Sequence, residues 1–110
     1  MDIETIKKYL SYYIDEVITP RFLEEPNEDG IESLKLYDVL KGSFQPPIIH
    51  IFIDTVPKVG TPKSTTKTNL RKVEKDVERF IRMFGIKFPV KVHLNKRPFI
   101  KKGKTLDTNV

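Results

Sequence analysis

The chain has 110 residues, with 20 Lys and Arg, 15 Asp and Glu, and a formal net charge of +5. This length suits a single domain with a modest core. The absence of Cys excludes a disulfide framework, a thiol nucleophile and a Cys-ligated metal site. No apolar run reaches the roughly 20 residues of a membrane-spanning helix, and the first residues lack the regions of a signal peptide. We therefore expect an intracellular protein.

The charge is divided sharply along the chain. Residues 1–56 hold 5 basic and 11 acidic residues, a net charge of −6, whereas residues 57–110 hold 15 and 4, a net charge of +11. Such a division predicts either an acidic surface opposed to a basic one, or a basic half that meets a polyanion. The alternative is that the two kinds of segment interleave in the fold and cancel.

A first amphipathic helix is predicted to begin after Asp2, whose carboxylate can cap the free amides of the first turn. Pro20 should end this helix at or near Ile18, because the residue before a proline avoids the helical region. The apolar face recurs at helical spacing. It comprises Ile3, Ile6, Leu10, Tyr13, Ile14 and Val17.

Three tyrosines, Tyr9, Tyr12 and Tyr13, lie close together in this helix. We interpret them as bordering the core, with a partner surface as the alternative. Residues 20–30 form an acidic loop without the ligand spacing of a calcium loop, so solvated carboxylates are expected there. The acidic contact surface that we predict consists of Glu24, Glu25, Glu28 and Asp29.

Residues 31–42 have an ambiguous pattern. Ile31, Leu34, Tyr37 and Leu40 could line a short helix that Gly42 closes, and this interpretation is slightly favoured. An edge strand is the alternative, because alternate residues in part of the segment are apolar.

A βαβ-like unit follows and should carry most of the core. It comprises a strand over residues 48–56, a hydrophilic loop over 57–67, a helix from about Thr68 to Phe84, and a strand over 88–94. Gly85 is the expected left-handed residue after the helix. The predicted fold is an α/β (α+β) domain over residues 1–100, with two or three strands and two main helices on one face of the sheet. Residues 101–110 are predicted to be a flexible basic tail.

The two histidines, His50 and His93, lie centrally in these strands, on the face opposite the aliphatic one, and Asp54 shares that face. Two imidazoles and a carboxylate can hold a divalent metal. The simpler interpretation is a pair of half-exposed side chains on an open sheet face. We predict no metal, no cofactor and no catalytic residues, because nucleotide-binding and catalytic motifs are missing.

Two functions remain. The favoured one is a non-enzymatic assembly protein whose acidic and basic surfaces join copies head to tail in a homo-oligomer or larger assembly. The Lys- and Ile-rich composition without Cys or Trp resembles that of small phage virion proteins, such as head–tail connector or neck components. The alternative is a nucleic-acid-binding domain. In either case the predicted basic contacts are Lys58, Lys63, Lys67, Arg71, Lys72, Lys96, Arg97, Lys101, Lys102 and Lys104.

Overall fold

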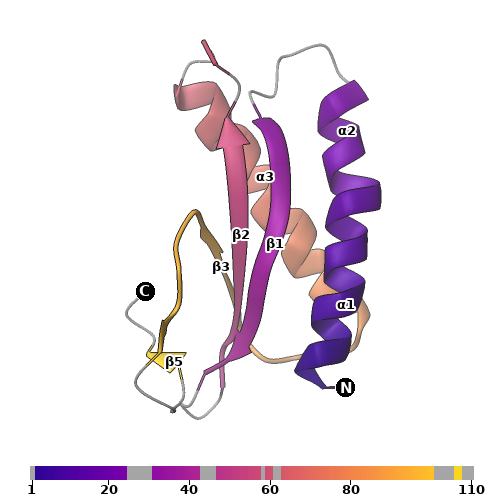
Figure 1. The fold of residues 1–110 in the computed structure, drawn as a ribbon. Helices are drawn as coiled ribbons and strands as arrows, with labels where there is room; N and C mark the ends of the chain where they lie inside the picture. The colour runs from indigo at the N-terminus through magenta and orange to yellow at the C-terminus, as the bar shows by residue number, and fades with distance from the viewer. Residues whose placement is uncertain are drawn as a thin grey trace.

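The computed structural model describes residues 2–24, 31–42, 47–57, 59–60, 63–100 and 106–107. Strands β1, β2 and β3 form a mixed sheet in the order β1-β2-β3, and β4 and β5 form a separate two-stranded sheet. Helices α1 and α3 lie on one side of the larger sheet (Figure 1), which confirms the predicted small α+β fold. The elements are α1 (Ile3–Tyr13), η1 (Ile14–Ile18), α2 (Thr19–Glu24), β1 (Ile31–Lys41), β2 (Ile49–Pro57), α3 (Lys63–Met83), β3 (Val90–Leu94), β4 (Phe99–Ile100) and β5 (Leu106–Asp107).

The first helix begins as predicted but does not end where predicted. Asp2 caps it, since its Oδ1 accepts a hydrogen bond from the Thr5 amide at 2.7 Å. The helical path then continues past Ile18 to the end of α2, so the predicted stop before Pro20 is wrong. The reason is the π-helical segment η1, in which the Thr19 amide donates five residues back to the Ile14 carbonyl. This wider turn accommodates the ring of Pro20 and its missing amide.

The π segment also changes which side chains face the core. Ile14 and Ile18 are buried, whereas Val17, predicted on the apolar face, is exposed. A π turn contains one more residue than an α turn, so every later residue is rotated relative to a regular helix. Ile18 therefore takes the place that a 3.6-residue period assigns to Val17.

Residues 31–41 form strand β1, so the favoured helical interpretation is wrong and the edge-strand alternative is correct. β1 pairs antiparallel with β2, with shifts of register between Ile31 and Ser33 and between Leu36 and Asp38. Each shift changes which face the following residues occupy. The core-facing residues Ile31, Leu34, Leu36 and Val39 therefore include pairs three apart, the spacing that resembles a helix.

The predicted βαβ unit is confirmed, because β2 and β3 pair in parallel on either side of α3 in the chain. Helix α3 begins at Lys63 rather than Thr68, so residues 63–67 belong to the helix and not to the predicted loop. Gly85 follows the helix with φ of +79°, as expected.

One apolar cluster joins the helices to the sheet. Its members come from α1 and η1, β1, β2 and α3, and Ile51 and Ile53 are completely buried at its centre. The buried cluster consists of Ile6, Leu10, Ile14, Ile18, Ile31, Leu34, Val39, Ile49, Ile51, Ile53, Val73, Val77 and Ile81.

The chain after β3 turns back along the other side of the sheet (Figure 1). Asn95 makes this turn with φ of +57°, a region that Asn tolerates better than most residues. Its side chain fixes the turn to β2, because Oδ1 accepts from the Thr55 amide and Nδ2 donates to the Thr55 hydroxyl, at 2.8 and 2.6 Å. Farther on, β5, which lies in the predicted tail, pairs with β4, which lies just before it. The other tail residues, 101–105 and 108–110, lie outside the described ranges.

We expect Ile51→Ala to reduce the free energy of unfolding by about 2–5 kcal/mol, because it leaves a cavity in the core. Val56→Ala is the matched control on the same strand: this side chain is exposed, so its loss should cost less than about 1 kcal/mol. Urea denaturation followed by circular dichroism measures both. Equal losses for the two variants would contradict the assignment of the core.

Candidate interaction surfaces

The outward side of α3 carries a continuous row of cations. Lys67, Arg71 and Lys75 follow one another at four-residue spacing, with Lys72 beside them, and all four are exposed. We call these four residues the α3 basic face. Within the described ranges no ion pair involves any of them. Their charge is therefore presented to solvent.

One acid of α3 is paired away from this row. Asp76 pairs with Arg21 of α2 and with Arg79, with nitrogen–oxygen distances of 3.2 and 3.3 Å. Glu74 and Glu78 lie three residues after Arg71 and Lys75, at the border of the row. Burial, and secondarily the charge of Glu78, raises the pKa of Glu74, and Arg71 opposes this shift. The α3 basic face therefore keeps an excess of cations, four against these two neighbouring acids.

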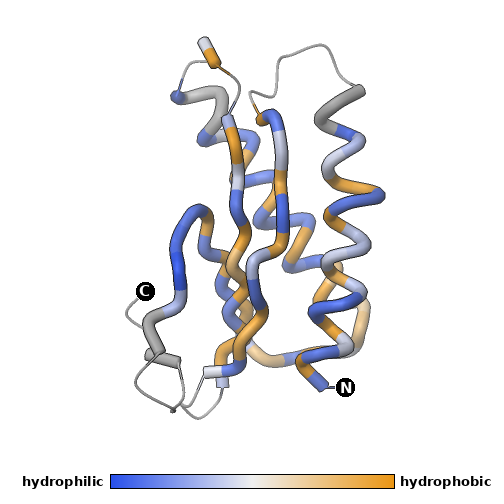
Figure 2. The backbone as a smooth tube through the Cα atoms, in the orientation of Figure 1, coloured by the Kyte–Doolittle hydropathy of each residue, from blue (hydrophilic) through white to orange (hydrophobic). Residues whose placement is uncertain are grey.

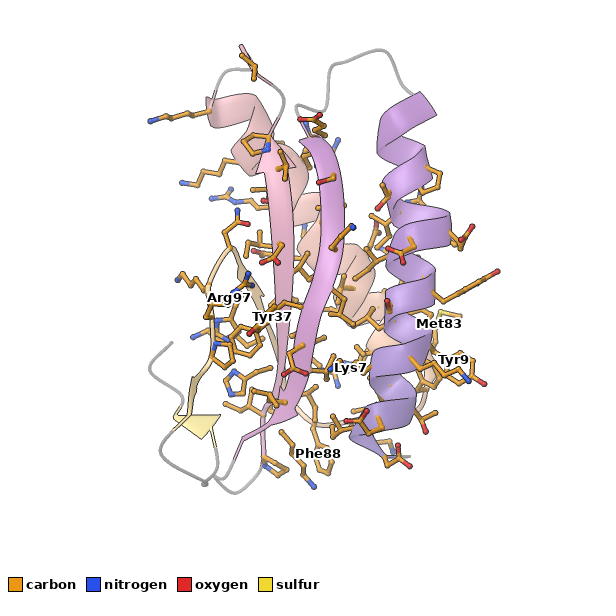
Figure 3. All side chains as sticks on the ribbon, in the orientation of Figure 1. Lys7, Tyr9, Tyr37, Met83, Phe88 and Arg97 are labelled. Carbon is orange, nitrogen blue, oxygen red and sulfur yellow. The ribbon has the colours of Figure 1, made fainter. Side chains whose placement is uncertain are left out.

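The predicted basic residues do not all gather on one surface. Lys63 is exposed at the start of α3 and Lys96 is exposed after β3. Arg97 already has partners within the chain. Its two terminal nitrogens donate to the Asp54 carboxylate at 2.5 and 3.2 Å, and its guanidinium stacks over the Tyr37 ring at 3.7 Å (Figure 3). The remaining members, Lys58, Lys101, Lys102 and Lys104, lie outside the described residues.

The predicted acidic surface is largely outside the described part of the chain. Glu24 is the last residue of α2, its side chain is not described, and Glu25, Glu28 and Asp29 lie in the gap that follows. Other exposed acids are present in the same half of the chain. They are Asp2, Glu4, Asp15, Glu16 and Glu32.

An exposed aromatic surface lies where α1 and α3 meet. Tyr13 is half-buried and stacks on Phe80 with ring centroids 4.3 Å apart, as expected for a tyrosine that borders the core. Tyr9 is 49% exposed, Tyr12 is 66% exposed and Met83 is 78% exposed. The rings of Tyr9 and of Phe84, the residue after Met83, have centroids 5.8 Å apart. We call Tyr9, Tyr12 and Met83 the aromatic patch. The sequence interpretation favoured the core border for Tyr9, Tyr12 and Tyr13 and kept a partner surface as the alternative, because helical period alone does not locate the edge of a core.

The two histidines come together as their position on one sheet face predicts, but they are buried rather than half-exposed. Phe52 and His93 are direct neighbours in the parallel pair, which places His50 diagonally next to His93. His50 Nδ1 and His93 Nε2 are 2.9 Å apart, and the rings stack with Phe52. Gly42 closes the site, since a Cβ there would lie 3.4 Å from His50 Nε2.

A hydrogen bond between two imidazole nitrogens requires a single hydrogen between them. Protonation of one ring would place a charge in a buried site, and protonation of both rings would set two N–H groups against each other. Burial, followed by the charges of His50, Lys91 and Lys96, lowers the pKa of His93 to about 4, and burial also lowers the pKa of His50. Asp54 is held by Arg97, and the described residues contain no group of three metal-ligating side chains.

A pocket of about 260 Å³ opens at the end of the molecule where α1 begins and β1 ends. Its walls are mainly apolar, from Ile3, Ile6, Ile49, Ile86 and Phe88. Asp2 and Lys41 are the polar residues of the lining, and the Lys41 ammonium lies 5.4 Å from the centre of the Phe88 ring. We call this the base pocket.

Comparison of the chain with protein-family models, with curated proteins and with solved structures finds no match in any of the three. Among the described helices, none combines the length and the apolar character needed to cross a bilayer. The surfaces described above therefore carry the functional argument by themselves.

The histidine pair predicts a loss of stability in mild acid. Unfolded His93 has a pKa of 6.5 and folded His93 one of about 4, so between these values the unfolded state binds more protons. Stability should then fall as the pH is lowered, by up to about 1.4 kcal/mol per pH unit for each such histidine. Urea denaturation between pH 7 and 4.5 tests this slope. His93→Gln should flatten it, and an unchanged slope would contradict the role given to His93.

Proposed function

We propose that this protein is a non-enzymatic assembly module that binds other protein subunits, including copies of itself, through charge-complementary contacts. The observation that carries the proposal is the α3 basic face, a row of exposed cations without ion-pair partners among the described residues. Exposed acids lie on α1, η1 and β1 of the same chain. A molecule that bears both surfaces can bind its own copies by heterologous contacts.

The aromatic patch supports a protein partner. Exposed Tyr and Met side chains next to arginine are enriched at protein interfaces, and Lys and Glu are depleted in interface centres. Tyr9 and Met83 have this character, and Arg79 and Arg82 lie on the same end of α3. Charge would set the register and the rate of encounter, while the patch would supply buried area.

Nucleic-acid binding is the second candidate, favoured by the same α3 basic face, because such a row can follow phosphates. A single-strand binder needs aromatic stacking platforms beside its cations. Here Met83 lies roughly 12 Å along the helix from Lys75 and roughly 24 Å from Lys67. Most of the row therefore has no member of the aromatic patch beside it, which supports a protein partner.

The first experiment is light scattering of the purified protein at low and high salt, before and after nuclease treatment. A discrete oligomer or a growing mass at low salt that dissociates as salt screens the charges is the expected result. A monomer that retains nuclease-sensitive material would transfer the function to nucleic acid. A monomer under every condition would overturn self-assembly.

Four substitutions then test the surface itself. Changing Lys67, Arg71, Lys72 and Lys75 to Gln should weaken association at low salt by at least tenfold, since the attraction loses its source. The matched control removes four other exposed charges, at Lys8, Lys35, Lys87 and Lys91, and so has the same net charge. If both variants lose association equally, net charge rather than the α3 basic face drives it.

A connector or neck component of a phage virion is one setting in which head-to-tail contacts of this kind operate. Its support is the composition of the chain alone, and it remains a prediction.

A further inference from the structure

The base pocket has the size of a side-chain receptor. Its volume of about 260 Å³ lies below the 300–1,000 Å³ typical of small-molecule sites. It is nevertheless far larger than the roughly 30 Å³ share of one water molecule. Isoleucine side chains from α1, β2 and the loop after α3 form its walls, so an aliphatic group fits it chemically.

The rim of the pocket includes the acidic first turn of α1. The Thr5 amide lowers the pKa of Asp2, which keeps this carboxylate anionic. Glu4 is exposed on the same turn. Lys41 is directed over the Phe88 ring. The carboxylates of Asp2 and Glu4 can therefore attract an apolar side chain that has a cation next to it.

The opposite end of the molecule presents such a group. Val59 is fully exposed in the turn between β2 and α3, and a Cβ added to the neighbouring Gly60 would touch nothing within 4 Å. The Val59 side chain is therefore fully open to solvent. Lys63 is exposed four residues later, at the start of α3. An aliphatic tip with a nearby cation is the counterpart of an aliphatic pocket that has Asp2 and Glu4 on the α1 side of its rim and Lys41 on the β1 side.

The tip and the pocket lie at opposite ends of the elongated molecule, which measures 42 × 27 × 18 Å along its principal axes. Figure 2 shows the hydrophobic tip at the top, beyond β2, while the start of α1 lies at the bottom. Figure 3 places Phe88 at that bottom end. Because β2 connects the two ends, the same chain cannot fill its own pocket with this turn.

We propose that Val59 of one copy inserts into the base pocket of a second copy, so that the chains join head to tail. This inference rests on the proposed function and names its contact. Two different surfaces meet, so the contact is heterologous and repeats until a ring closes or a filament grows. Apolar burial holds the tip in the pocket, and Lys63 of one copy faces the carboxylates of the other.

Light scattering of two variants and their mixture tests the contact. Val59→Asp removes the tip, and Ile3→Trp fills the pocket; Ile86→Trp fills it from another wall and serves if Ile3→Trp does not fold. Each variant alone should lose self-association, by at least tenfold. A 1:1 mixture should form dimers of twice the single-chain mass of 12.8 kDa, because one intact tip and one intact pocket remain. Val56→Asp, also on an exposed valine, is the control and should assemble like the parent chain.

The outcomes separate the two proposals. If the parent chain assembles and Val59→Asp assembles equally, the tip-in-pocket contact is wrong while the assembly function stands. A mixture that remains monomeric would also overturn the contact. If the parent chain is monomeric at every salt concentration, the tip-in-pocket contact and self-assembly are both wrong, and only binding to a different subunit is left of the proposed function.

Discussion

Strand β2 is buried on both faces, and the rest of the structure depends on this. Its Ile51 and Ile53 face α1, η1 and α3, while His50 and Phe52 face the side along which the chain returns after β3. A strand that is covered on both faces needs, on each face, side chains that are apolar or that have hydrogen-bond partners within the protein. The aliphatic face satisfies this need with isoleucine. The other face carries Phe52 and two histidines that bond each other, and of the buried nitrogens of this pair only His50 Nε2 is left without a hydrogen-bond partner among the described residues.

Both interaction surfaces follow from the packing on this strand. Helix α3 uses Val73, Val77 and Ile81 against the sheet, so its polar side must face outward, where the cations gather. The α1–α3 contact is made largely by rings such as Tyr13 and Phe80, and its outer edge is the aromatic patch. The exposed charges are carried by helices whose backbone is already ordered. Binding of a partner therefore has to order the charged side chains but not the backbone beneath them.

Elements set by local rules could be predicted from the sequence. The Asp2 cap, the Gly85 terminus and the parallel strands on either side of α3 were all predicted correctly. Features set by tertiary context were not. The two register shifts gave β1 a helix-like spacing, and the π turn carried the chain through Pro20. Local propensity contains no information about a partner strand or an extra residue in a turn.

The candidate site was predictable to a similar extent. Lys67, Arg71 and Lys72 were named from charge and spacing, and the structure places them on one surface of α3. Arg97 was named with them, but only the fold shows that Asp54 and Tyr37 occupy it. The exposure of Tyr9 and Tyr12, the burial of the histidines and the base pocket depend on contacts between distant segments.

The π turn between Ile14 and Ile18 has a consequence for how this chain can vary. A π turn is what a single-residue insertion leaves inside an α-helix. Deleting one residue here would restore the regular period and return a residue such as Val17 to the core face, but Pro20 would then clash with the preceding turn. Replacing Pro20 alone would leave the wide turn without the proline ring that it accommodates. In evolutionary terms the extra residue and the proline are epistatic, and a lineage should gain or lose them together.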